Sequence, residues 1–114
     1  MRYQYLDGNG NKYLIVKNEQ ITLEYFPMEP SLSSSGIYDG GEYVKKDLEA
    51  SQFEQLQDLI ENAQSHTSDH IPDRVKGSGQ IIITRQKDSE KFILRLNSEY
   101  LEEIESFLSK IIKD

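Results

Sequence analysis

Two histidines, His66 and His70, stand four residues apart, a spacing that places both imidazoles on one face of a helix. Such a pair can chelate zinc or nickel, with Asp69 or Asp73 as a further oxygen ligand. The helical pattern before them ends near Gln64, however, and the fuller HExxH signature with its general base is absent. We therefore interpret both histidines as polar side chains of a solvated loop, and we predict no metal and no other cofactor.

A serine run, Ser33 to Ser35, raises the question of a nucleophile activated by one of the histidines. The Gly-x-Ser-x-Gly pattern of a nucleophile elbow is missing, because Gly36 follows the serines and no glycine precedes them at the required spacing. Serines before a glycine are typical of turns. The sequence thus presents no catalytic constellation, and it favours a non-enzymatic protein without settling the question.

Two glycine-rich stretches resemble ion-binding loops only superficially. Gly36, Gly40 and Gly41 are not followed by the Lys-Ser or Lys-Thr pair of a phosphate-binding loop, and Asp39 would repel a phosphate. Residues 7–11, DGNGN, place oxygen side chains at alternate positions as a calcium loop does, but no glutamate follows at the twelfth-position spacing. Asp-Gly and Asn-Gly are the usual residues of a tight hairpin turn, which is the interpretation we prefer.

Composition excludes several other functions. The chain has no cysteine, so disulfides, thiolate catalysis and cysteine-ligated metal clusters are excluded. Its net charge of −7 opposes binding to nucleic acid, because that affinity comes mainly from cationic neutralisation of phosphates. No window approaches the roughly 18 apolar residues of a membrane span, and the start lacks a signal-peptide pattern. If Met1 is the native start, we expect a cytoplasmic protein with no membrane partner, whereas a mature secreted fragment behind a new methionine would show the same pattern.

The length of 114 residues fits one domain, residues 1–114. Residues 2–6 and 12–17 alternate with period two around the DGNGN turn and predict a hairpin. A third strand is expected over residues 20–26, where Pro27 stops it, and a short edge strand over residues 42–47.

Two helices and a second hairpin follow. Ser51 to Glu54 has the pattern of a capping box, and the apolar residues after it recur at helical spacing up to Ala63. Residues 81–85 and 91–96 predict strands, and Asn97 or Ser98 is expected to cap the last helix. Its inward face is predicted to comprise Leu101, Ile104, Phe107, Leu108 and Ile111, and its outward face Glu99, Glu102, Glu103 and Glu105.

The fold class that follows is α+β, an antiparallel sheet of about five to six strands with two helices on one face, in the order β-β-β-(β)-α-β-β-α. In the last hairpin Phe92, Leu94 and Leu96 share one face, whereas Ile82 and Ile93 fall on the other. A sheet face turned to water should alternate more cleanly. Either the N-terminal strands or a second subunit covers Ile82 and Ile93, giving a homodimer in the second case, or the two residues are tolerated at the surface.

The longest irregular stretch is residues 27–43, PMEPSLSSSGIYDGGEY. Loops of this length are uncommon in compact domains and tend to be functional. Ile37, Tyr38 and Tyr43 stand among small residues, a composition suited to protein contacts, although Ile37 and Tyr38 could instead pack the loop against the domain's own core.

We predict a protein-binding or regulatory domain. The alternatives are a small-molecule or peptide pocket, enzymatic or not, and a self-associating structural subunit. The predicted binding residues are Ser33, Ser34, Ser35, Gly36, Ile37, Tyr38, Asp39, Gly40, Gly41 and Tyr43.

Overall fold

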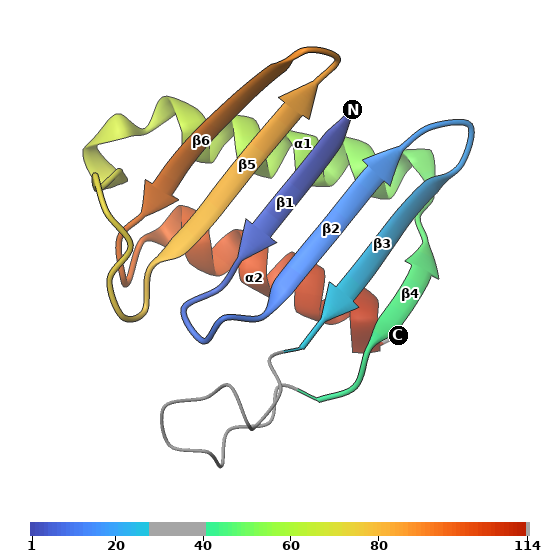
Figure 1. The fold of residues 1–114 in the computed structure, drawn as a ribbon, viewed down its shortest axis with the longest axis horizontal. Coiled ribbons are helices and arrows are strands. Elements are labelled where there is room, and N and C mark those ends of the chain that lie inside the picture. The colour runs from blue at the N-terminus through green and yellow to red at the C-terminus, as the bar shows by residue number, and fades with distance from the viewer. Residues whose placement is uncertain (28–40, 114) are drawn as a thin grey trace.

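The computed structural model describes residues 1–27 and 41–113, which form one six-stranded antiparallel sheet with two helices on one of its faces (Figure 1). The strand order across the sheet is β4-β3-β2-β1-β5-β6. This confirms the predicted α+β class and element order. The elements are β1 (Arg2–Leu6), β2 (Lys12–Lys17), β3 (Ile21–Phe26), β4 (Val44–Asp47), α1 (Ala50–Ser65), a 3-10 turn η2 (Thr67–Asp69), β5 (Gly79–Arg85), β6 (Asp88–Leu94) and α2 (Glu99–Lys113).

The face of the sheet under the helices is built from rows of side chains that run across the strands. One row aligns Tyr25, Tyr13, Tyr5 and Ile81 on four neighbouring strands. Ring centroids are 4.8 Å apart for Tyr13 and Tyr25 and 5.7 Å apart for Tyr5 and Tyr13. Cross-strand aromatic pairs stabilise a sheet beyond the area they bury. The period-two pattern of the first three strands therefore places an aromatic row in the core.

Helix α1 starts earlier than its sequence pattern suggests. The predicted capping box at Ser51 and Glu54 is wrong in register, because the N-cap is Glu49 and the Oε1 atom of Gln52 accepts from the Glu49 amide at 2.9 Å. A Glu–Gln pair is a less common box than Ser–Glu, so the stronger sequence signal was misleading. The buried residues of α1 are Phe53, Leu56, Ile60 and Ala63.

Helix α2 buries four of its five predicted inward residues, whereas Phe107 is half-buried on the side towards α1. Glu105 does not simply point to water, since it accepts a hydrogen bond from the buried hydroxyl of Tyr5. Burial, followed by this bond to a carboxylate, raises the pKa of Tyr5 far above its ordinary value. The polar flank of α2 thus has a specific contact with the central part of the sheet.

The second hairpin differs from its prediction at the outer end. Strand β6 ends at Leu94, so Leu96 lies beyond the sheet and is exposed, not in the core with Phe92. Ile82 and Ile93 do lie on the face without helices, which we call the open face, where Ile93 is only 5% exposed. The N-terminal strands do not cover this face, because they form the middle of the same sheet.

The two buried tyrosines of β1 give a matched test of the contact with α2. Tyr5 donates to Glu105, whereas the buried Tyr3 hydroxyl has no partner among the described residues. We expect Tyr5→Phe to lower the free energy of unfolding by about 1–2 kcal/mol, because a partly buried carboxylate loses its donor. Tyr3→Phe should change it little or raise it. Urea denaturation of both variants measures the difference, and equal losses would contradict the assignment.

Candidate functional site

The two histidines are hydrogen-bonded to the C-terminal turn of α1. His66 Nδ1 lies 2.7 Å from the carbonyl oxygen of Asn62, and His70 Nε2 lies 2.9 Å from that of Ala63. A carbonyl oxygen only accepts, so each of these ring nitrogens carries its proton. The imidazoles therefore add donors to two carbonyls of the last turn, which also accept from the Ser65 hydroxyl and the His66 amide.

Both imidazole rings are also packed against aromatic side chains. His66 stacks on Tyr100 with centroids 4.2 Å apart, and His70 stacks on Phe92 at 4.8 Å. Across residues 1–27 and 41–113 no group of three or more His, Asp or Glu side chains is placed to hold a metal ion. His66 is exposed and His70 is half-buried, and the segment between them is also fastened to α1, α2 and β6.

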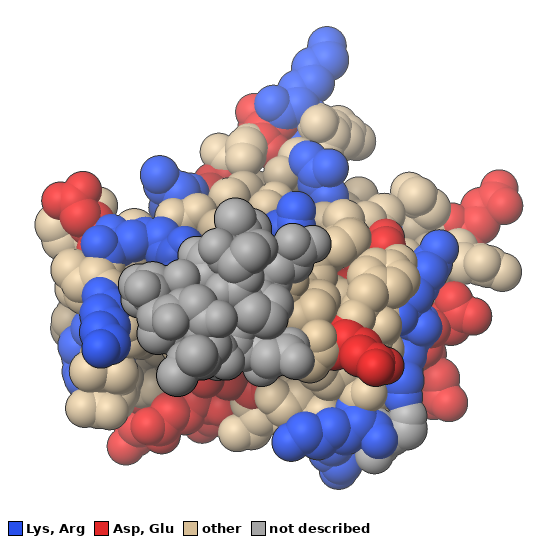
Figure 2. Space-filling model, turned by 60° about the horizontal axis from the view of Figure 1, so that its bottom comes forward, with Lys and Arg blue, Asp and Glu red and all other residues tan. Residues whose placement is uncertain are grey.

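One end of the sheet collects the exposed large hydrophobic side chains of the described chain. Tyr43 is 52% exposed, Val75 58% and Leu96 54%. All three lie at the end where β1, β3 and β6 finish and β2, β4 and β5 begin, at the bottom of Figure 1. We call this region, made of residues 7–11, 71–78, 95–98, Phe26 and Tyr43, the loop end. Figure 2 brings it forward and shows Lys and Arg interspersed with Asp and Glu around apolar and neutral surface.

Tyr43 is held in a defined orientation at the loop end. Its ring packs against Phe26 with centroids 5.3 Å apart, and its hydroxyl donates to Glu24 Oε2 at 2.5 Å. The bond to this carboxylate raises the pKa of Tyr43. On the same strand end, Lys12 Nζ lies 5.0 Å from the Phe26 ring centroid, within cation–π range. These four residues form an aromatic corner whose outermost side chain is half in water.

The β1–β2 turn is ordered by the side chain of Asp7. Its Oδ1 accepts from the backbone amides of Asn9 and Asn11, and its Oδ2 accepts from Asn11 Nδ2, each at 2.9 Å. Gly10 has a φ of +92°, which a residue with a side chain rarely adopts. The predicted hairpin turn is confirmed, and both carboxylate oxygens of Asp7 serve the turn itself.

A second loop is locked to that turn by direct backbone contact. Arg74 Nη2 donates to the Asp7 carbonyl at 2.7 Å. A Cβ atom on Gly8 would lie 2.7 Å from the Gly77 Cα, and one on Gly77 would lie 2.6 Å from Leu96 Cδ1. Since two glycines are needed for this approach, the loop carrying Val75 and the turn carrying Leu96 form one unit with the hairpin.

Asp69 fastens the start of this segment to the turn before α2. Its Oδ2 accepts from Ser98 Oγ at 2.7 Å, and its Oδ1 accepts from Arg95 Nε at 3.2 Å. The hydrogen bond from Ser98 and the charge of Arg95 hold the pKa of Asp69 below its ordinary value. Ile71 then donates to the Ile93 carbonyl at 2.9 Å, which extends the sheet beyond β6.

Two of the predicted binding residues can be placed. Gly41 is exposed with a φ of +101°, and Tyr43 belongs to the aromatic corner. The sequence missed Val75 and Leu96. Leu96 continued the alternation of β6 and was assigned to its buried face, while Val75 was one apolar residue within a polar stretch. The predicted residues that lie outside the described part of the chain are Ser33, Ser34, Ser35, Gly36, Ile37, Tyr38, Asp39 and Gly40.

Comparison with known proteins found no family model, no curated relative and no solved structure that this chain matches. Neither helix of the described residues has the length and apolar character needed to cross a membrane.

The contact of Asp69 with Ser98 and Arg95 predicts part of the loss of folding stability at low pH. Because its pKa is lower in the folded protein, Asp69 contributes stability above the unfolded value of 3.8, and this contribution is lost as the pH falls through the folded pKa. We expect Asp69→Asn to be less stable than the wild type at pH 7 and to lose less stability on acidification. Thermal melts from pH 7 to pH 2 measure this, with the exposed Asp73→Asn as control. Parallel curves for the wild type and Asp69→Asn would contradict it.

Proposed function

We propose that this protein is a non-enzymatic binding domain for another protein, and that the loop end is its contact surface. The observation that carries the proposal is that Tyr43, Val75 and Leu96, each more than half exposed, lie at the same end of the sheet, Tyr43 beside β4 and the other two beside β5 and β6. Isolated surface apolar residues are normal, so the proposal depends on all three being exposed at the same end of the domain.

The order of the described loops supports the same proposal. Asp7 and the Gly8–Gly77 contact fix two loops against each other, and the bond to Glu24 fixes the Tyr43 ring. Loops presented by a rigid sheet are common binding surfaces, because little conformational entropy is lost on association. Tyrosine adds large contact area with few rotatable bonds.

The predicted contact residues 33–40 join this surface in our proposal. They stand in the chain between Phe26 and Tyr43, the two rings of the aromatic corner. A partner that contacts Tyr43 therefore contacts a residue that follows Ile37 and Tyr38 by only a few positions in the sequence. The alternative of a ligand pocket between sheet and loop involves this same segment and stays a prediction.

The first test replaces the exposed apolar residues. Tyr43→Ser, Val75→Ser and Leu96→Ser together should reduce partner capture at least about tenfold, since each residue would bury most of its exposed area in a complex. Quantitative affinity capture from the native source against the wild type measures the ratio. The control Glu54→Gln, Asp58→Asn and Glu61→Gln changes exposed α1 residues and should retain capture. Undiminished capture by the serine variant would remove the proposal.

The second test concerns the long loop. Replacing Ile37 and Tyr38 with serine should abolish capture of the same partner while the melting temperature changes by less than about 2 °C. A drop of several degrees would instead place these residues in the protein's own core. A thermal melt beside the capture experiment therefore distinguishes residues that contact a partner from residues that belong to the core.

Self-association through the open face is a second candidate. On the open face, Gln4 of β1 pairs with Leu14 of β2 on one side and with Ile82 of β5 on the other. Both apolar residues are half-buried. Ile93, at 5% exposure, offers little contact area to a second copy. Sedimentation velocity on the wild type and on Ile82→Lys tests this candidate. It requires a dimer that the substitution weakens, and a strict monomer at high concentration eliminates it.

A further inference from the structure

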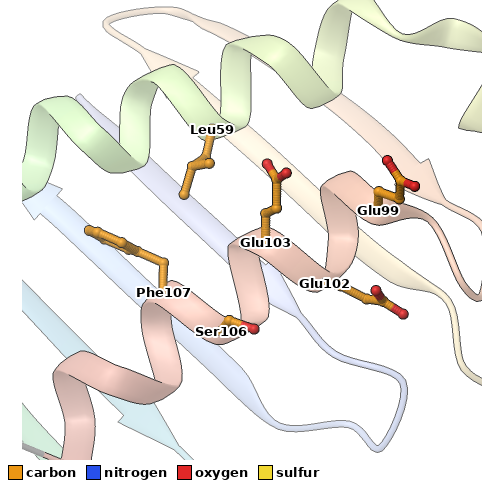
Figure 3. Close-up of a pocket in the computed structure, with 6 residues that line it drawn as sticks. All are labelled: Leu59, Glu99, Glu102, Glu103, Ser106 and Phe107. Carbon is orange, nitrogen blue, oxygen red and sulfur yellow. The ribbon is translucent and has the colours of Figure 1, made fainter.

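A groove runs between the two helices on the side of the molecule away from the open face (Figure 3). It is a shallow, open depression of about 520 Å³. Leu59 of α1 and Phe107 of α2 point into the space between the helices, and Glu103 points into it beside them. The remaining lining residues, Glu99, Glu102 and Ser106, all come from α2.

The floor of the groove is apolar but incompletely covered. Leu59 and Phe107 pack against the core from outside and are both half-buried, so part of each side chain still meets water. The sequence assigned Phe107 to the inward face of α2, and its position beside Leu59 explains why it is not fully enclosed. Two large apolar side chains at the base of an open groove suit the apolar side of an amphipathic segment.

The rim of the groove is acidic, and its carboxylates have no cationic partner among the described residues. Glu99, Glu102 and Glu103 are exposed, and none of them forms an ion pair within the described residues. Their spacing places them along about one turn of α2. The two lysines of this helix, Lys110 and Lys113, stand in its last turn. Helix α1 carries no Lys or Arg at all, so the helix layer supplies no cation near this rim.

We propose that this groove binds a basic amphipathic helix of a partner protein. Its apolar residues would lie on Leu59 and Phe107, and its Lys or Arg residues would meet Glu99, Glu102 and Glu103. Helix-in-groove recognition uses apolar anchors at i, i+3, i+4 and i+7, and complementary charge at the rim fixes the orientation. The residues substituted here are not those of the loop-end test, so the two proposals can fail independently.

The test uses a defined probe, an 18-residue fluorescein-labelled peptide of Leu and Lys arranged with helical periodicity. Fluorescence anisotropy should show saturable 1:1 binding. Glu99→Gln, Glu102→Gln and Glu103→Gln together should raise the Kd at least about tenfold, because three charge pairs at an apolar contact are lost. Leu59→Ser should also raise it several-fold, with a thermal melt to show that the domain remains folded.

A matched variant separates groove binding from general attraction to an acidic protein. Glu54→Gln, Asp58→Asn and Glu61→Gln remove the same number of charges from α1 residues that do not line the groove. This control should raise the Kd less than about threefold, since dispersed surface charges act weakly. The loop-end variant, with Tyr43, Val75 and Leu96 all changed to serine, should bind the peptide like the wild type.

Three outcomes would overturn the proposal. Equal weakening in both charge variants would show non-specific attraction. Equal binding of a peptide with the same residues in scrambled order would show that the amphipathic face is not read. Sedimentation showing a dimer that the Glu99, Glu102 and Glu103 variant dissociates would make a second copy of this chain the occupant.

Discussion

The hydrogen bond between the Tyr5 hydroxyl and Glu105 joins a central strand of the sheet to the helix that covers it. The same region packs closely around Gly79, where a Cβ atom would lie 2.3 Å from Leu101 Cδ1 and 2.9 Å from the Tyr5 ring, so any side chain there would displace both neighbours. A misplaced α2 would leave a carboxylate and a phenol without partners in a largely apolar contact, which costs more than the net value of the bond. This constraint fixes the helix layer on the sheet.

The position of α2 then determines both surfaces to which we assign binding. Its N-terminal end is preceded by Ser98, which donates to Asp69 and so holds the segment that leads to Val75. Its flank towards α1 presents Phe107 and Glu103 to the groove. The loop end lies at the ends of the strands and the groove lies on the helix layer, and the two adjoin where Ser98 meets Glu99. Each is supported by the packing of the same helix, and neither requires a movement of the other.

The fold was predictable from the sequence because its signals are local and repeated. Alternation in the strands, helical spacing in α1 and α2 and the DGNGN turn each specify one element, and the short connections leave an antiparallel sheet as the simple arrangement. The start of α1 was less predictable, since Ser51 and Glu54 imitate a capping box that Glu49 and Gln52 form instead. Boundaries depend on which of several similar caps the tertiary packing selects.

The candidate surfaces were much less predictable. Tyr43 was identified because tyrosine among small residues is typical of contacts, but Val75 and Leu96 become neighbours of the hairpin turn only through the Gly8–Gly77 contact. A contact between residues almost 70 positions apart leaves no periodicity in the sequence. The two histidines illustrate the same limit, because their carbonyl partners depend on where α1 ends.

The backbone pairing of Ile71 with β6 has a consequence for the behaviour of the protein at high concentration. An unprotected outer strand can recruit another chain and begin fibril growth. Here residues 69–71 occupy the hydrogen-bonding positions beside Ile93 and Arg95, and the opposite border of the sheet, β4, is only four residues long and carries Lys45 and Lys46. Pairing of copies edge to edge is therefore hindered at the C-terminal end of β6 and along the short, charged β4, while the rest of the β6 border is the side on which a second strand could add.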